Sequence, residues 1–385
     1  MPALVRSILT PAAVFRLVLG WGAVAALALA GPVLAPPVPA PLLVAALVLI
    51  VGVILVCAFG VVHEAEHLAH RLGDPYGSLV LTLSIVLIEV VLIAAVMLGP
   101  GDHVTIARDS VMAVSMIILN LVIGLCLLVG GIRHGSLRPN RTGTSAFLAM
   151  LVVLCSLALA LPALVGTDGA YTPGQELPVV VVTLALYAFF LVRQMGAQAD
   201  DFREVDPRVV ARQVARGEVA SRTGRPGVVG VIAEHRSELM LRAGLLVATV
   251  LPVVLLSHDM AALLDDGLGR LGAPVALSGV LIALIVFLPE SITSLRAALA
   301  GEGQRVSNLC HGALVSTVGL TIPAVLVIGG LTGQTVVLAE SPANLLLLGV
   351  TLLLSVTTFA TTKVTATHGA AHLVVFAVYG MTLFS

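Results

Sequence analysis

Charged residues are scarce in this chain. Only 11% of its 385 residues are Asp, Glu, Lys or Arg, and 58% are apolar, whereas a soluble globular protein carries about 25% charged residues. So few charges cannot cover a water-soluble body of this size, which excludes an ordinary cytosolic enzyme and a disordered chain. A net charge of −1 provides no basic surface for DNA or RNA, so we expect no nucleic-acid partner. A polytopic membrane protein in a lipid bilayer remains.

The sequence also lacks cysteines in the C-x-x-C spacing. The four cysteines lie inside apolar runs and none forms a C-x-x-C pair. They carry no information about the redox compartment and are typical of small core residues.

Eleven apolar stretches are long enough to cross a membrane, for which a helix needs roughly 20 residues. They cover about 12–30, 41–62, 77–98, 109–131, 144–165, 178–195, 239–257, 274–298, 306–330, 342–360 and 369–384. The sequence therefore predicts an all-α polytopic membrane protein with eleven transmembrane helices. The one long polar segment, 197–238, is net neutral, and we expect a short helix at 207–220 within it.

Orientation follows from the basic residues, which favour the cytoplasmic side. With the N-terminus inside, 18 of the 20 lysines and arginines fall on the cytoplasmic side, and only Arg108 and Arg270 fall outside. This split supports a bacterial cytoplasmic membrane protein with a cytoplasmic N-terminus. Because the count works with the first helix kept, we expect that helix to be retained rather than cleaved as a signal peptide.

The helix order predicts an inverted repeat. Residues 1–40 hold one extra helix, 41–196 a first set of five helices, 197–238 a cytoplasmic loop and 239–385 a second set of five. Five is odd, so the second set enters the membrane from the opposite side, as in many secondary transporters. The second helix of each set holds one carboxylate, and a gap of about fifteen residues precedes that helix.

Those two carboxylates are Glu89 and Glu290, each deep in an apolar helix. A charge at bilayer depth costs at least about 2.5–3.5 kcal/mol and usually marks an ion or proton pathway. The alternative is a neutral carboxyl that packs helices, which is less expected for two at matching repeat positions. Pro289 supports the interpretation of an ion pathway, because a proline inside a helix frees a carbonyl one turn back, near Ile285.

Oxygen-bearing side chains surround both glutamates along the sequence. We expect the amides to be better ligand candidates than the hydroxyls, because a membrane Ser or Thr most often bonds its own backbone. The candidates are Asn120, Asn308, Ser84, Ser291, Ser316 and Thr317. Such oxygens suit Ca²⁺, which takes six to eight of them.

The two carboxylates suggest an exchange mechanism. A low dielectric favours their neutral form, so each readily holds a proton. A divalent cation can replace two protons without changing the net charge of the site, whereas the empty dianion is penalised. Differential stability of two conformations would then couple the opposing fluxes.

Four stretches resemble the bacterial calcium/proton antiporters of the Cha type, in the calcium/cation antiporter superfamily. They are GSLVLTLSIVLIEVVLIAAVM, VALSGVLIALIVFLPESITSLRAAL, RVSNLCHGALVSTVGLTIPAVLVI and the ending GAAHLVVFAVYGMTLF. The resemblance implies a ten-helix core of two inverted repeats plus an extra N-terminal helix. It also implies export of Ca²⁺, Na⁺ or K⁺ against protons, no cofactor, and cation-binding roles for Glu89, Glu290 and Asn120. In the second repeat the position matching Asn120 falls near Ser316 and Thr317.

Some family features differ here. Gly-Asn or Gly-Thr-Ser often precedes the glutamate in related exchangers, whereas Leu87-Ile88 and Leu288-Pro289 do so in this chain. The central loop is rich in arginine rather than acidic, so we expect no calcium-sensing tract in it.

A competing motif lies at residues 63–67. The sequence HEAEH fits H-E-x-x-H, in which two histidines bind zinc and the glutamate, here Glu64, acts as base. An intramembrane zinc metalloprotease is therefore an alternative, and a channel or structural membrane protein is a third. In an intermediate interpretation, His63, Glu64, Glu66 and His67 line an inner vestibule that gathers cations or protons.

Overall fold

The computed structural model describes residues 8–31, 34, 38–72, 83, 86, 89–90, 93–94, 97, 104–215, 228–274 and 276–384. In chain order they form α2 (Pro11–Ala30), α3 (Ala40–Leu72), α5 (Ile106–Met116), η1 (Ile117–Val122), α6 (Ile123–His134), α7 (Arg141–Cys155), η2 (Ser156–Ala160), α8 (Leu161–Val165), α9 (Pro173–Met195), η3 (Ala199–Phe202), α10 (Pro207–Ala215), α11 (Val228–Arg270), α12 (Ala276–Ala300), α13 (Gly303–Thr332), α14 (Pro342–Phe359) and α15 (Ala366–Thr382). Extended pairing in these residues is limited to isolated bridges. The all-α prediction is confirmed.

Nine helices of the described residues are long and apolar enough to cross a membrane. Ten of the eleven predicted spans are found as helical segments, the shortest being α15 with 17 residues. In the eleventh, predicted at 77–98, every described residue is helical. The chain is a polytopic helical membrane protein.

Two helices continue well beyond their predicted ends. α3 extends to Leu72 and α11 to Arg270, so most of the described residues in both predicted gaps are helical rather than loops. The prediction placed the ends where the apolar runs stop. Backbone hydrogen bonds do not depend on hydropathy, so an α-helix can continue into water as a polar helix.

The chain divides into two compact units. Unit 1 comprises residues 1–95 and 224–289, and unit 2 comprises residues 96–223 and 290–385. Each unit therefore combines segments from both halves of the sequence. The division into two inverted repeats along the sequence stays a prediction.

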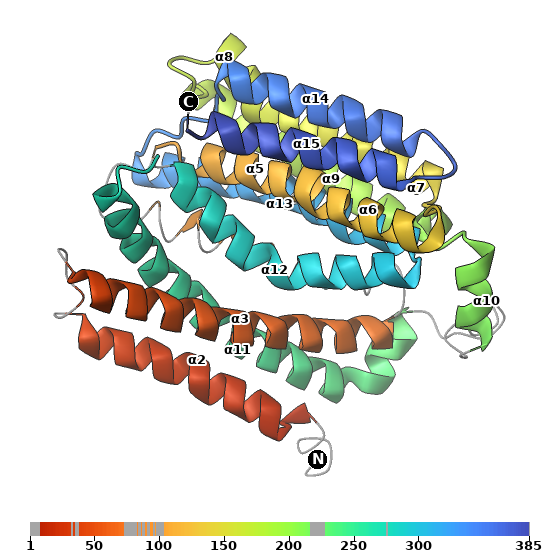
Figure 1. The fold of residues 1–385 in the computed structure, drawn as a ribbon, viewed down its shortest axis with the longest axis horizontal. Helices are drawn as coiled ribbons and strands as arrows, with labels where there is room; N and C mark the ends of the chain where they lie inside the picture. Colours follow the sequence, from red (N-terminus) through yellow and green to blue (C-terminus); the bar gives the residue numbers. More distant parts are fainter. Residues whose placement is uncertain are drawn as a thin grey trace. The chain divides into compact units, whose positions relative to one another are not determined.

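In unit 1, α2, α3 and α11 pack side by side (Figure 1). A small residue permits this close approach, because a Cβ added at Gly20 would lie 2.9 Å from Pro252 Cβ and 3.0 Å from Cys57 Sγ. Trp21 Nε1 also donates to the Ala248 carbonyl at 3.1 Å. Membrane helices associate through such small residues, since lipid supplies no hydrophobic drive between helices.

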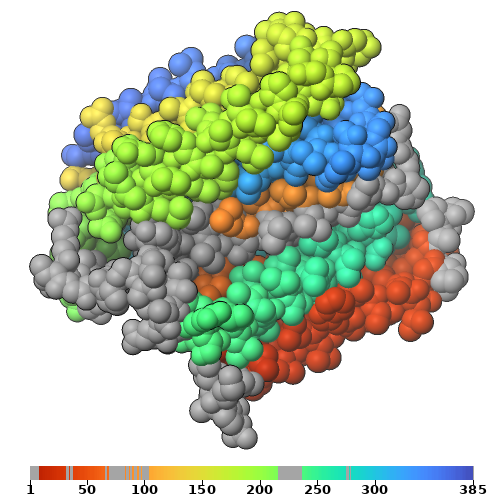
Figure 2. Space-filling model, turned by 180° about the vertical axis from the view of Figure 1, so that it is seen from behind, coloured from red at the N-terminus to blue at the C-terminus, as the bar shows by residue number. Residues whose placement is uncertain are grey.

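In unit 2, α13 packs against α7 and α9, and α15 packs against α6. Figure 2 shows α9 (yellow-green) lying beside α13 (blue). The α6–α15 crossing also depends on glycine, because a Cβ at Gly131 would meet Ala366 N at 2.3 Å and one at Gly369 would meet Leu128 N at 2.4 Å. A larger residue at either position would force the two backbones apart.

Unit 2 contains two π-helical turns. η1 interrupts the helix formed with α5 and α6, and η2 interrupts the helix formed with α7 and α8. Such turns are rare and frequently lie at functional sites. η1 contains Asn120, one of the predicted ligands.

The polar segment after α9 is partly structured. η3 follows α9, and the short helix predicted at 207–220 is found as α10 at Pro207–Ala215. Asp206 caps α10, because its Oδ1 accepts from Arg208 N at 2.9 Å. Pro207 is suited to the first helical position, where no backbone N–H is needed.

Candidate cation and proton site

Glu89 belongs to unit 1 and is 4% exposed. The described residues around it are helical, and Val86 and Ile93 are buried on the same helix. Spacings of three and four place these three residues on one face. Glu89 therefore lies on a buried helix face among apolar residues. The predicted ligand Ser84 lies outside the described residues.

Glu290 belongs to unit 2, in the middle of α12, and is 5% exposed. Cys310 Sγ of α13 donates to Ser294 Oγ at 3.6 Å, and Ser294 lies one turn after Glu290 on the same face of α12. Glu290 therefore lies near the Cys310 level of α13. Pro289 cannot donate the helical hydrogen bond to the carbonyl of Ile285.

Other hydroxyls lie on α12 and α13. Ser291, next to Glu290, is half-buried, and Ser316 and Thr317 are buried in α13. Ser316 Oγ accepts from Tyr187 Oη of α9 at 2.9 Å. Ser316 therefore links α13 to α9, and its oxygen retains a further acceptor position.

Asn308 occupies a different level of α13. Its Nδ2 donates to the Phe202 carbonyl of η3 at 2.7 Å, and its Oδ1 accepts from Gln304 Nε2 at 2.7 Å. Eight residues separate Asn308 from Ser316, which is about 12 Å along a helix. Asn308 thus attaches the polar segment to α13 and is not brought beside Ser316.

Asn120 is at the centre of a buried hydrogen-bond network in unit 2. Its Nδ2 donates to Thr351 Oγ1 of α14 at 2.8 Å, and His372 Nδ1 of α15 donates to its Oδ1 at 3.2 Å. Thr358 Oγ1 lies 3.3 Å from His372 Nε2, which the Nδ1–H tautomer leaves as an acceptor. All four residues are fully buried. The network joins η1, α14 and α15.

The sequence interpretation missed His372, Thr351 and Thr358. A usable signal existed for His372, because a histidine inside an apolar helix is itself a functional candidate. No comparable signal marks the threonines, since a membrane threonine most often bonds its own helix. Their network became visible only when three helices were packed together.

His311 is fully buried in α13 of unit 2. Its Nδ1 lies 3.0 Å from Ser307 Oγ, which lies 2.9 Å from Thr144 Oγ1 of α7. The ring packs edge-on against Phe359 with a centroid separation of 4.9 Å. His311 therefore packs between α7, α13 and α14.

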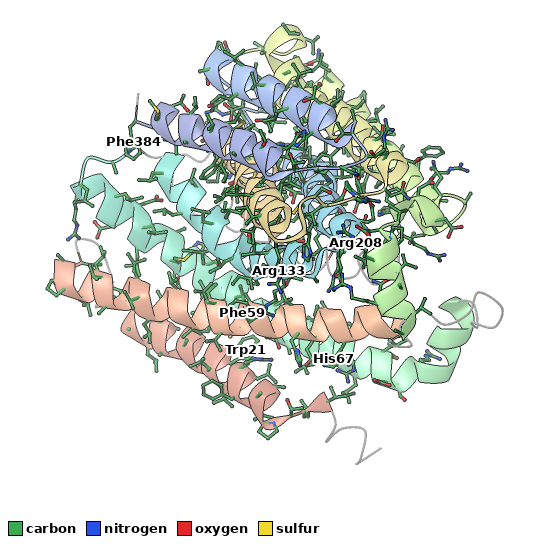
Figure 3. The ribbon with its side chains drawn as sticks, turned by 45° about the vertical axis from the view of Figure 1, so that its right-hand side comes forward. Trp21, Phe59, His67, Arg133, Arg208 and Phe384 are labelled. Atoms are coloured by element: carbon green, nitrogen blue, oxygen red, sulfur yellow. The ribbon has the colours of Figure 1, made fainter. Side chains whose placement is uncertain are left out.

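The H-E-x-x-H motif lies on α3 of unit 1. His63 and His67 are exposed with ring centroids 4.6 Å apart, and Figure 3 shows His67 near the C-terminal end of the helix. Glu64 is buried and accepts from Arg242 Nη1 at 3.0 Å. For Glu66 the structure describes only the helical backbone. The glutamate that would act as base in a protease is thus engaged in an ion pair.

Among the described residues, no group of three or more His, Cys, Asp or Glu side chains has a metal-binding arrangement. The zinc-protease interpretation therefore receives no support from the structure. His63, Glu64 and His67 remain vestibule residues only as a prediction.

The polar segment is fixed to the start of α13 through Glu204. Its Oε2 accepts from Gln304 N at 3.1 Å, and its Oε1 accepts from Val205 N at 3.0 Å. Gln304 Oε1 in turn accepts from Asn140 N at 2.6 Å. Burial raises the pKa of Glu204, and these backbone hydrogen bonds oppose the shift in part.

Comparison with known proteins identifies a family for this chain. The family model described as sodium/calcium exchanger protein matches residues 42–196 and 229–384. The chain is 32% identical over 340 residues to the sodium-potassium/proton antiporter ChaA of Escherichia coli, covering 86% of this chain and 87% of that protein. It is 36% identical over 331 residues to y4hA of Sinorhizobium fredii, named as an ionic transporter, covering 85% of each.

Several solved structures share the fold. The H⁺/Ca²⁺ exchanger CAX has a TM-score of 0.66 at 12% identity, covering 96% of this chain and 88% of that one. Native YfkE has a TM-score of 0.61 at 13% identity, covering 96% and 99%. The sodium-calcium exchanger NCX_Mj has a TM-score of 0.55 at 14% identity, covering 88% and 97%.

Apolar helices of spanning length, a matching family model over most of the chain and two relatives above 30% identity lead to one conclusion. The chain belongs to the sodium/calcium exchanger protein family and is a multi-pass membrane transporter of inorganic cations rather than an enzyme.

Proposed function

We propose that this protein exchanges cytoplasmic Ca²⁺ for external protons across the bacterial cytoplasmic membrane by alternating access. The observation that carries the proposal is the burial of Glu89 and Glu290, which are 4% and 5% exposed in otherwise apolar helices. Carboxylates in such surroundings are expensive to keep as charges and usually mark ion pathways. The relatives named as a sodium-potassium/proton antiporter and an H⁺/Ca²⁺ exchanger support the class of cargo.

In this proposal the two glutamates hold either protons or a cation. One Ca²⁺ replaces two protons without changing the net charge of the pair, so both loaded states can cross while the empty dianion cannot. Oxygens from Ser84, Ser291, Ser316 and Thr317, together with the Ile285 carbonyl, would complete the ligand shell. Na⁺ and K⁺ are the other cargoes to be tested.

The two predicted amide ligands already have hydrogen-bond partners. Both polar atoms of Asn308 are engaged at the start of α13, and both polar atoms of Asn120 are engaged with α14 and α15. We propose that Asn120 positions the helices around the ligands and that Asn308 anchors the polar segment. Direct coordination by either amide would first require its hydrogen bonds to open.

The test is proton-driven uptake of Ca²⁺, Na⁺ and K⁺ into everted membrane vesicles. Glu89→Gln and Glu290→Gln should each reduce Ca²⁺ exchange to background, because neither amide can exchange a proton or supply a negative ligand. The protein level in the membrane should not change. Asp168→Asn, at an exposed acid in a loop of unit 2, is the matched control and should keep full activity. Full exchange in either glutamine variant would remove that residue from the site.

A further inference from the structure

Glu340 lies at the end of unit 2 where α5 and α14 begin and α15 ends. It lies two residues before the first residue of α14, outside the spans, and its backbone N donates to the Leu159 carbonyl of η2 at 3.0 Å. The residue is only 7% exposed. A carboxyl in a connecting segment is therefore held inside the protein, although segments of this kind usually keep acids in water.

The two carboxyl oxygens have different surroundings. Oε2 accepts from Ser341 N at 3.0 Å and from Asn344 Nδ2 at 2.9 Å. Oε1 is buried and has no hydrogen-bond partner among the residues that the structure describes. An ionised oxygen without water or a donor is costly. A proton on Oε1 removes the charge and with it most of this cost.

The charges around Glu340 also favour one added proton. Arg108 of α5 donates to Asp109 Oδ1 at 2.9 Å and to the Ala339 carbonyl at 3.1 Å, and Thr105 Oγ1 donates to Asp109 Oδ2 at 2.8 Å. Arg108 and Asp109 both act electrostatically on Glu340. With Glu340 ionised the three charged groups sum to −1, and one proton makes them neutral.

Among the residues that the structure describes, Tyr379 of α15 is the other titratable group at this cluster, and it lies within electrostatic range of both Glu340 and Asp109. Burial raises the pKa of the Glu340 carboxyl, while Asn344, Ser341 and Arg108 lower it in part. The direction of this pKa shift agrees with the hydrogen-bond geometry, because both favour the protonated Glu340 carboxyl.

We propose that Glu340 is a proton-binding residue of the exchange reaction, which loads a proton from water at this end of unit 2 and releases it again. The part about exchange rests on the proposed function, whereas proton binding by the carboxyl does not. The ligand is a proton rather than a metal ion. Two acids and an adjacent guanidinium supply too few negative ligands for a divalent cation, and no three-ligand group exists among the described residues.

Infrared difference spectroscopy of the purified full-length protein tests proton binding without transport. Lowering the pH should produce a C=O stretching band from a protonated carboxyl, and Glu340→Gln should abolish one such component. Asp168→Asn is the control, because this exposed acid has a left-handed backbone (φ 53°) that asparagine tolerates. If Glu340→Gln retains every protonated-carboxyl band of the wild-type protein, the proposal is overturned.

Asn344→Ala supplies a second, independent test, since the change is at a partly exposed position and leaves the carboxyl in place. Loss of the Asn344 donor should shift the titration of the Glu340 band upward by about one pH unit. An unchanged titration overturns the proposal.

Vesicle transport then separates the two proposals. In Glu340→Gln vesicles, exchange should no longer depend on the pH of the aqueous compartment on the Arg108 side of the membrane, over the pH range in which the wild-type Glu340 band titrates. Glu89→Gln should abolish exchange and keep the Glu340 band. Absent exchange in the wild type together with a titrating Glu340 band would refute the proposed function and leave proton binding intact. An unaltered pH profile in Glu340→Gln would remove Glu340 from the exchange reaction.

Discussion

A charged side chain buried among helices is stable only when opposite charges lie against it. Arg242 of α11 shows this arrangement, because it contacts Glu64 at 3.0 Å and Glu238 at 3.2 Å. The side chains of the three residues are only 12%, 7% and 11% exposed. The triad joins α3 to α11, so Glu64 of the protease-like motif has a structural partner.

Arg242→Leu should therefore lower the thermal stability of the purified protein. It removes the positive charge that faces two buried carboxylates, and breaking a buried ion pair typically costs about 3–5 kcal/mol. Thermal unfolding in detergent measures the loss, with Arg236→Leu, an exposed arginine of the same helix, as the control. Replacing all three triad residues by apolar ones should recover much of the loss. Equal melting temperatures for the two single variants would contradict the account.

At the scale of the helix, α10 depends on a local signal at its first residues. The carboxylate of Asp206 caps the helix and forms an ion pair with Arg208 at 2.8 Å. Arg212, which lies within α10, donates from Nη2 to the Ala300 carbonyl at the end of α12 at 2.7 Å. Such a cation is well placed at a helix C-terminus, where the carbonyls lack partners. The cap thus also supports a contact within unit 2.

Asp206→Ala should loosen α10, since losing a helix cap costs typically about 1 kcal/mol. Hydrogen exchange of residues 208–215 in the full chain measures this, and Asp200→Ala, at an exposed acid, should have little effect. The Arg208 guanidinium holds the pKa of Asp206 below its usual range. The stabilisation is therefore complete above the unfolded pKa of about 3.9 and is lost as the pH falls through the lower folded value. Protection that is unchanged on acidification would contradict this assignment.

For the whole molecule, the predicted orientation can be tested with cysteine labels. The native cysteines are buried, so background labelling by an impermeant maleimide should be low. Asp168→Cys should react in intact cells, because the arginine distribution assigns its loop to the outside. Asp201→Cys should react only after the membrane is opened. The reverse pattern would place the N-terminus outside.

Much of this architecture could be predicted from the sequence. The spans, the polar segment and α10 depend on hydropathy and on signals such as Asp206-Pro207, which act over a few residues. The predicted ends of α3 and α11 were too early, because hydropathy marks where an apolar run stops and not where the hydrogen-bonded helix stops. Among the predicted site residues, the depth of Glu89 and Glu290 followed from their surrounding apolar runs, and both are buried.

Bilayer thickness and side-chain polarity act along the local chain, so the sequence by itself determined the helical membrane class and the burial of the two glutamates. Only the tertiary structure decided the partners of the other polar groups. Asn120 and His372 are 252 positions apart, and Glu64 and Arg242 are 178 apart. Hydrogen bonds require atoms within about 3 Å, and helix packing, which a single segment does not encode, brings such distant residues to that distance.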